Sequence, residues 1–441
     1  MENCEDRFAL PAVPSFMEGV YLGVNAVKDA YLLVNCPQGC YYRFEKVSIN
    51  HDAASTLYDP LGCHRIIQSG INYTELAMGT EETLFKLVKK VVEKVKPRAL
   101  FFTQVSMTLV TSFDAAAFAS EMERRFSVPL FYIPPATFNG DFLEGFNAFM
   151  ETLVEAVMGI SRAKHGASGT ASVCGYFADR LEEDHIANAD EISRLIGSAG
   201  IECGGVALSG ASLEELGKTF AAPAIVNLPY ARSAGRKIAE MTGAPVIDLD
   251  LPVGIEGTVK WIRDFAGACG GKADAEKFIG RELGRIIPKI AIARRRYLLN
   301  RSVAIAADPY LAPVLAIYAS ELGMNVPLVA LKTRNSAVSG RAREILGNAG
   351  MECKVINDFP HEEFHAAVAE LSDEDRCDAV IGTDAELDAA SDAGTGFVEI
   401  GYPSFFRHSF FPQPFMGFSG ALRIANDLVN AVQQRDYSAN K

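Results

Sequence analysis

Short apolar runs alternate with longer amphipathic stretches along the chain. The first runs are "AYLLVN" (30–35), "RALFFT" (98–103) and "PLFYIP" (129–134), and their aromatic and β-branched content is typical of buried strands. Between them, "EETLFKLVKKVVEKV" (81–95) places apolar residues at helical spacing. Strands that alternate with helices in this way predict βαβ units and a largely parallel sheet.

The same alternation returns twice further along the chain, each time with its own strands and helices. The sequence therefore predicts an α/β fold of three doubly wound, Rossmann-like units in series, with mostly parallel sheets. The second group comprises strands at 171–177, 223–228 and 245–250 and a helix at 188–200; the third follows a long basic helical pattern at 275–301 and comprises strands at 302–308, 326–331, 378–382 and 397–401 and a closing helix at 420–434.

A chain of 441 residues is too long for one hydrophobic core, which agrees with several domains. The Gly- and Ala-rich stretch 159–172 is the best candidate for the first boundary. We expect an N-terminal tail (1–20), a first α/β domain (21–165), a second (166–298), and a third that ends with the C-terminal helix (299–441).

The charge pattern restricts the possible partners. The net charge is −13, and the densest basic stretch (293–301) is interrupted by apolar residues, so nucleic acid is not an expected partner. No window approaches 18 uninterrupted apolar residues, and the acidic N-terminal stretch lacks the apolar core of a signal peptide. With nine cysteines and no such signal, we expect a cytoplasmic protein without a membrane span.

Three of the cysteines, Cys36, Cys40 and Cys63, fall within 28 residues, and Cys40 and Cys63 each end a Pro-x-Gly-Cys turn. Soft thiolate sulfur suits iron clusters and can be presented from a turn at the end of a strand. The spacing matches no zinc module. From the residues alone, two interpretations remain open: a metal site, or small buried thiols.

Other chemical signatures are absent or incomplete. The stretch "LEELGKT" (213–219) ends like a phosphate-binding loop but lacks the first glycine and a preceding strand. The hydrolase elbow and the dinucleotide fingerprint are also missing. Two Pro- and Gly-punctuated loops, within 227–262 and 414–432, lie where α/β units bind ligands, although ordinary loops have the same composition.

Taken together, these segments resemble the nitrogenase component 1 superfamily over nearly the entire chain. "YLLVNCPQGCYYRF" (31–44) is similar to the family's strand and turn that supply a cluster cysteine, here Cys40. The stretches at 227–258 and 415–432 resemble later family segments, and the last is closest to the β-type subunits. The superfamily also includes cofactor-assembly scaffolds and protochlorophyllide reductases.

The sequence departs from the family pattern at several positions. Two family cluster cysteines fall near Pro14 or Ser15 and near Gln104, so Cys36 and Cys63 would act as substitute metal ligands beside Cys40. Tyr230 stands where α-type subunits have a cofactor cysteine, and Met416 where they have a cofactor histidine, so no molybdenum–iron cofactor is expected. Tyr230, Arg232 and Met416 are instead expected to line a crevice between the domains.

The resemblance implies an oxidoreductase subunit that is active only in a complex. It would receive electrons from an ATP-dependent iron–sulfur reductase through an iron–sulfur cluster of the [4Fe–4S] type and reduce a bound small molecule. A homologous component 1 type subunit would complete the assembly. The alternative is a non-catalytic scaffold that binds a metallocluster or a tetrapyrrole precursor. A third possibility is an α/β binding protein without a cluster.

Overall fold

The structure is a computed structural model that describes residues 12–40, 49–58, 64–111, 113–135, 139–161, 169–176, 180–371 and 377–439. It contains three parallel sheets, ordered β2-β1-β3-β4, β6-β5-β7-β8 and β11-β10-β9-β12-β13. In each sheet the first strand of the unit is central and the strand order reverses beside it, as in doubly wound folds. The predicted fold class is confirmed.

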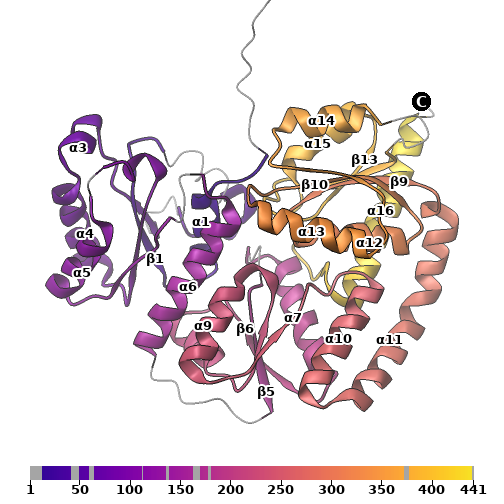
Figure 1. Ribbon diagram of the computed structural model, residues 1–441, viewed down its shortest axis with the longest axis horizontal. Helices are drawn as coiled ribbons and strands as arrows, with labels where there is room; N and C mark the ends of the chain where they lie inside the picture. Colours follow the sequence, from indigo (N-terminus) through magenta and orange to yellow (C-terminus); the bar gives the residue numbers. More distant parts are fainter. Residues whose placement is uncertain are drawn as a thin grey trace, which may run out of the picture.

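The first unit places its sheet between an outer and an inner pair of helices (Figure 1). Helices α4 and α5 cover the outer face with a small apolar cluster, while α1 and α6 cover the face toward the rest of the molecule. The bounds are α1 (Phe16–Asn25), β1 (Tyr31–Asn35), β2 (Ile66–Gln68), α3 (Tyr73–Met78), α4 (Glu81–Val95), β3 (Leu100–Gln104), α5 (Ala115–Phe126), β4 (Leu130–Tyr132) and α6 (Phe142–Ile160).

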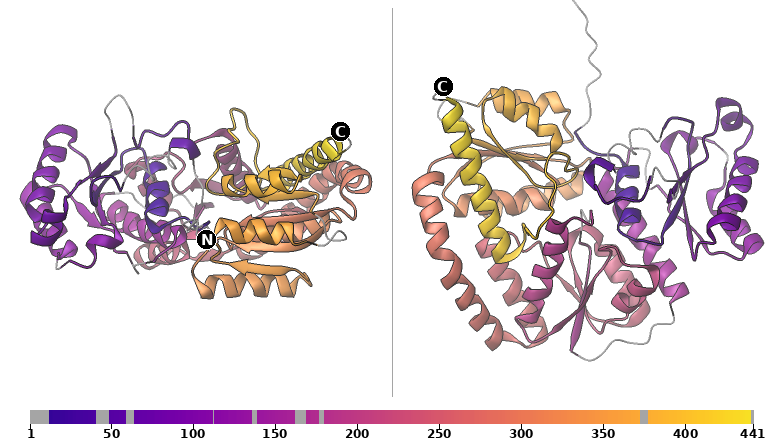
Figure 2. Two further views of the ribbon diagram at one scale, coloured as in Figure 1. Left: turned by 90° about the horizontal axis from the view of Figure 1, so that it is seen from above. Right: turned by 180° about the vertical axis from the view of Figure 1, so that it is seen from behind.

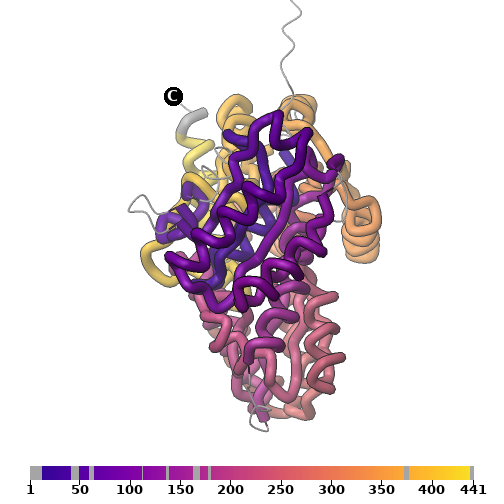
Figure 3. The backbone as a smooth tube through the Cα atoms, turned by 90° about the vertical axis from the view of Figure 1, so that its left-hand side faces the viewer, coloured from indigo at the N-terminus to yellow at the C-terminus, as the bar shows by residue number. Residues whose placement is uncertain are grey.

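The second unit lies below the other two, and its last helix rises along the side of the third (Figures 1 and 3). Glycine-rich β6 forms one edge of its sheet. The bounds are β5 (Thr170–Cys174), α7 (Glu183–Gly197), β6 (Glu202–Val206), α8 (Leu213–Phe220), β7 (Ile225–Asn227), α9 (Arg232–Thr242), β8 (Val246–Asp248), α10 (Ile255–Cys269) and α11 (Lys272–Ala293).

The third unit has the five-stranded sheet, whose central strand β9 is buried along its whole length. Helix α16 packs against β13 and also against α11 and α7 of the second unit, so it joins the two units (Figure 2). The bounds are β9 (Ser302–Ala307), α12 (Leu311–Glu321), β10 (Asn325–Leu331), α13 (Ser336–Asn348), β11 (Lys354–Asn357), α14 (His361–Ala369), β12 (Ala379–Gly382), α15 (Leu387–Asp392), β13 (Gly396–Glu399) and α16 (Gly417–Ala439).

Helices α1 and α6 approach each other closely because glycines lie at their contact. A Cβ atom on Gly19 would lie 1.8 Å from the Phe142 carbonyl oxygen, and one on Gly145 would lie 1.9 Å from that of Phe16. Every residue of α1 is buried. Helix α1 thus starts inside the segment 1–20 that was expected to be a tail, and the division into domains at 165 and 298 stays a prediction.

The sequence placed most of the long elements correctly. The helix expected at 81–95 is α4 with the same bounds, and the expected strands near 30, 100 and 130 are β1, β3 and β4. The stretch "LEELGKT" lies in helix α8 and does not form a loop after a strand. Within the described ranges, no helix combines the length and apolar character needed to cross a membrane.

Candidate functional site

A cavity of about 450 Å³ lies where the three units meet. The starts of four helices reach it: α6 of the first unit, α9 of the second, and α12 and α13 of the third. The last three helices follow strands β7, β9 and β10 of parallel sheets, and the carboxyl ends of such strands are where doubly wound folds bind ligands. The lining residues are Asp141, Leu143, Glu144, Asn147, Pro229, Tyr230, Arg232, Ser233, Arg236, Asp250, Leu251, Pro309, Tyr310, Val314, Thr333, Asn335, Val338, Arg341, Ala342 and Ile345.

Tyr230 sits in a short 3₁₀ turn (Pro229–Ala231) between β7 and α9, and it is one of the predicted site residues. Its hydroxyl donates a hydrogen bond of 3.0 Å to Asp308, which directly follows β9. Burial raises the pKa of the Asp308 carboxyl to about 6 and that of the Tyr230 phenol well above its usual value. Tyr310 packs edge-on against Tyr230, with ring centroids 5.1 Å apart. The two tyrosines therefore join the second and third units at the cavity.

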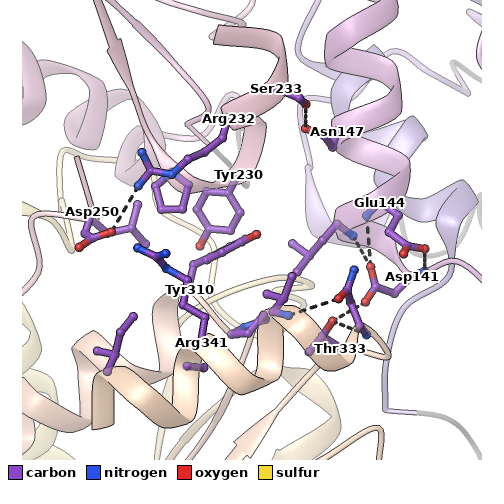
Figure 4. A pocket seen from close by; sticks show the side chains of 18 of the residues that line it. Asp141, Glu144, Asn147, Tyr230, Arg232, Ser233, Asp250, Tyr310, Thr333 and Arg341 are labelled. Atoms are coloured by element: carbon purple, nitrogen blue, oxygen red, sulfur yellow. Dashed lines mark hydrogen bonds and ion pairs between the residues drawn. The ribbon is translucent and has the colours of Figure 1, made fainter. Parts of the chain in front are cut away.

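Arg232, the second predicted residue, begins α9 and lies at the same wall (Figure 4). Its guanidinium donates to the carbonyl oxygens of Asn227 and Leu249 and forms ion pairs of 2.8 Å with Asp248 and 3.3 Å with Asp250. Burial alone would raise the pKa of Asp248, but the hydrogen bonds from Arg232 and Asn227 hold it below its usual value. The charge of Arg232 is thus balanced within the second unit.

Two polar contacts fix the first unit to the cavity. Asp141 caps α6 through the amides of Leu143 and Glu144, and its other carboxylate oxygen accepts from the Thr333 hydroxyl at 2.6 Å and from the Arg334 amide at 3.0 Å. These last two residues follow β10 of the third unit. The hydroxyl of Ser233, in α9, donates to Asn147 of α6 at 2.7 Å. Figure 4 shows both contacts on the α6 side of the cavity.

Met416, the third predicted residue, is buried and is not among the residues that line this cavity. Its backbone amide donates to Asn188 at 3.0 Å, and the Asn188 side chain also donates to the Tyr176 hydroxyl. The structure therefore brings Tyr230 and Arg232 together at the cavity and places Met416 elsewhere, directly before α16. A ligand-binding role for these three residues stays a prediction.

The candidate cluster cysteines lie in the first unit, at the carboxyl end of β1. Cys36 directly follows the strand and is buried, and Cys40 is half-buried at the end of the turn that contains Gly39. Gly39 has φ of 92°, a conformation that favours glycine, and nothing lies within 4 Å of the position of its missing Cβ. Cys63 is outside the described residues. Neither Cys36 nor Cys40 lines the cavity between the units.

The surroundings of these two thiols suit a soft metal group in part. Burial, with the nearby Cys40 as the second cause, raises the pKa of Cys36 to about 12, and burial also raises that of Cys40. The thiols therefore hold their protons unless a metal displaces them. The Cys36 thiol donates to Gln68 Oε1 at 3.8 Å, while Gln68 Nε2 is buried without a hydrogen-bond partner in the described structure. An orphaned amide donor beside a thiol can donate to cluster sulfur.

Two thiols are fewer than the four that an iron–sulfur cluster commonly takes. Within the part of the chain that the structure describes, no group of three or more His, Cys, Asp or Glu is arranged to hold a metal ion. A cluster at Cys36 and Cys40 would therefore need Cys63 or ligands from another chain.

The description "Nitrogenase component 1 type Oxidoreductase" belongs to a family model that matches residues 15–433. The chain belongs to this family. The resemblance inferred from the cysteine turn and the later segments is therefore confirmed. The family's curated members that match are chains of oxidoreductases, which agrees with the expectation of an oxidoreductase subunit.

Three relatives illustrate the similarity. The nitrogenase molybdenum-iron protein beta chain of Methanococcus maripaludis is 26% identical over 52% of this chain and 47% of its own length. A light-independent protochlorophyllide reductase chain of Rhodopseudomonas palustris (strain TIE-1) is 26% identical over 79% and 64%. The beta chain of Frankia alni nitrogenase molybdenum-iron protein is 21% identical over 94% and 80%. The first match spans only about half of the relative's length.

A solved structure, titled "Nitrogenase Cp1 at pH 6.5", has the same fold. It superimposes with a TM-score of 0.80, covers 99% of this chain and 95% of its own chain, and is 19% identical in sequence. At this sequence identity the likeness supports the fold, and no residue's function is transferred from that structure.

Proposed function

We propose that the chain is a subunit of a nitrogenase-like reductase complex. It receives electrons from an ATP-dependent iron–sulfur reductase through an iron–sulfur cluster and reduces a small molecule bound between its three units. The observation that carries this proposal is the family match over residues 15–433, together with two thiols at the carboxyl end of β1. The complex also contains a homologous component 1 type subunit and works in the cytoplasm.

In this proposal, Cys36 and Cys40 hold the cluster together with Cys63, and the cluster is of the [4Fe–4S] type. The cluster supplies one-electron transfer when it is bound. The chain contributes a turn with Cys40 half-buried and Cys36 buried, and the amide of Gln68 is available to donate to sulfur. A molybdenum–iron cofactor has no part, because Tyr230 and Met416 provide neither thiolate nor imidazole.

The cavity between the units is the proposed substrate site. Tyr230 and Arg232 form one wall, and Asp308 fixes the Tyr230 hydroxyl by accepting its hydrogen bond. Because the pKa of Tyr230 is raised, the phenol keeps its proton at neutral pH and is a poor proton donor by itself. Asp308, with a pKa of about 6, changes protonation close to neutral pH and can accept or return a proton through Tyr230.

The experiment that tests the cluster is iron and acid-labile sulfide analysis of protein purified without oxygen, with any subunit that copurifies. Cys40→Ala is compared with Cys353→Ala, because Cys353 is also a partly buried thiol whose pKa burial raises. We expect iron to be lost from the first variant and retained in the second, along with an electron paramagnetic resonance signal after reduction. Equal iron content in both variants would remove Cys40 from the ligand set.

A scaffold that binds a metallocluster or a tetrapyrrole precursor is the second candidate, favoured because the lining residues that the structure describes include no cysteine and no histidine for catalytic chemistry in the cavity. The two functions differ in turnover. With the partner reductase and ATP, a catalytic subunit supports ATP-dependent loss of substrate, whereas a scaffold binds iron or precursor without such loss.

A further inference from the structure

The cavity contains a positive charge that the protein itself does not balance. Arg341 lies on the first turns of α13 and is exposed. Among the described residues its guanidinium has no hydrogen bond and no ion pair, unlike Arg232, which has two acidic partners. A cation that stays unpaired inside a concave site can bind an anion from solution.

The acids in the lining are already occupied. Asp141 accepts four hydrogen bonds, and Asp250 faces Arg232. Glu144 accepts the Asp141 amide, and burial raises the pKa of its carboxyl. None of these three carboxylates is within ion-pair distance of Arg341, so its charge is available to a ligand.

The rim adds to the positive potential. Arg236, on α9, reaches Asp248 only at 3.6 Å and leaves 63% of its side chain exposed. The N-terminus of α9 also lies here without a side-chain cap and carries a partial positive charge, whereas the first amides of α6, α12 and α13 already donate to Asp141, Asp308 and Asn335. Arg341, Arg236 and the start of α9 therefore favour an anion on this side of the cavity.

The remaining wall is apolar and aromatic. Tyr310 lies beside Arg341 in the cavity (Figure 4), and the described residues give the Tyr310 hydroxyl no hydrogen-bond partner. Several aliphatic side chains face the same space: Leu143, Leu251, Val314, Val338 and Ile345. A volume of about 450 Å³ accommodates a molecule of drug-like size. Such a wall prefers a ligand with a hydrophobic body.

We propose that the cavity binds an organic carboxylate with an apolar body, whose anionic group is held by Arg341 and the Tyr310 hydroxyl, with Arg236 guiding its entry. This inference rests on the proposed function, because it takes the cavity to be the substrate site, and it names the substrate class. Charge and aromatic contact hold the ligand, since the described residues of the lining include neither a cysteine nor a histidine to coordinate a metal.

The test is isothermal titration of the full chain, with any copurifying subunit, using 2-naphthoate as the probe. Its neutral analogue 2-naphthamide and inorganic phosphate are titrated in parallel, without reductase or ATP. We expect 2-naphthoate to bind at least tenfold more tightly than either. Arg341→Gln should weaken 2-naphthoate binding at least tenfold. Arg343→Gln should change it less than twofold, because Arg343 lies on the same helix but is not among the lining residues and donates to Asn357.

Equal affinity for 2-naphthoate and 2-naphthamide, or equal effects of the two arginine variants, would overturn the proposal. Phosphate binding as tight as that of 2-naphthoate would overturn it as well, because the apolar wall would then select nothing. Iron is measured in the same preparations. Protein that contains iron and does not bind 2-naphthoate contradicts this inference but not the cluster proposal. Protein that binds 2-naphthoate and contains no iron contradicts the cluster proposal but not this inference.

Discussion

Lys332 and Glu386 form a buried ion pair at the carboxyl ends of β10 and β12, and replacing the lysine offers a sharp test of the fold. The side chains are 0% and 1% exposed, with Nζ 2.7 Å from Oε2. The same carboxylate oxygen accepts from the amide and hydroxyl of Thr383, while Oε1 is buried without a described partner. In Lys332→Met the carboxylate of Glu386 keeps only the Thr383 donors.

The cost follows from leaving a charge buried without its counter-ion. Removing one member of a buried ion pair destabilises a protein by about 3–5 kcal/mol, whereas replacing both members by apolar residues is often neutral or stabilising. We therefore expect Lys332→Met to lower the free energy of unfolding by about 4 kcal/mol at pH 7. The double variant Lys332→Met with Glu386→Leu should recover most of that loss, by about 2–4 kcal/mol.

The assay is urea unfolding followed by circular dichroism and by the fluorescence of Trp261, the one tryptophan in the chain. Lys89→Met is the matched control, because Lys89 faces Glu93 at 3.9 Å with both side chains more than half exposed, and a change within about 0.5 kcal/mol is expected. If Lys332→Met costs no more than Lys89→Met, or if the double variant is as unstable as the sum of its singles, the reasoning is wrong.

Two further variants test the helix contact and the Tyr230 wall. Gly145→Ala would place a Cβ against the Phe16 carbonyl and should lower the free energy of unfolding by about 1–3 kcal/mol. Its control Gly159→Ala, in the same helix with open space around the glycine, should raise the free energy of unfolding by about 0.5–1 kcal/mol. Urea midpoints that shift alike in the two variants would contradict this. Burial raises the folded-state pKa of Asp308 to about 6, so its contribution to stability is full below pH 4 and is lost as the pH rises through 6. Between pH 4 and 7, the wild type should therefore lose about 3 kcal/mol more unfolding free energy than Asp308→Asn, and parallel pH profiles would refute this.

The sequence predicted the elements whose hydrophobic pattern is long or fully apolar. The helix 81–95 shows three buried positions at helical spacing and ends as predicted, and β9 is buried throughout. Strands β2 and β6 were missed for local reasons. β2 has only three residues, and β6 contains Gly204 and Gly205, which are rare in strands.

The residues that line or support the cavity were harder to predict from the sequence than the location of the cavity. The family resemblance put Tyr230 and Arg232 in a crevice between the domains, but neither it nor the residue pattern gave a comparable signal for Asp141, Asp308 or Arg341. A signal existed in part, since Asp308 is the last residue of the predicted strand at 302–308, where parallel strands end. Asp141 and Thr333 are 192 residues apart, and no periodicity connects positions so distant.

The two sites differ in how much of their chemistry a single chain contains. The cavity is assembled within one chain, because Tyr230, Asp308 and Asp141 link all three units through hydrogen bonds. The described part of the cysteine site provides two thiols, and both have a raised pKa. Because two thiols are too few for a cluster, the site needs further ligands. It follows that carboxylate binding can be measured on the isolated chain, whereas iron binding is best measured with the copurifying subunit. A chain that binds 2-naphthoate alone but acquires iron only in the complex would fit this division between the two sites.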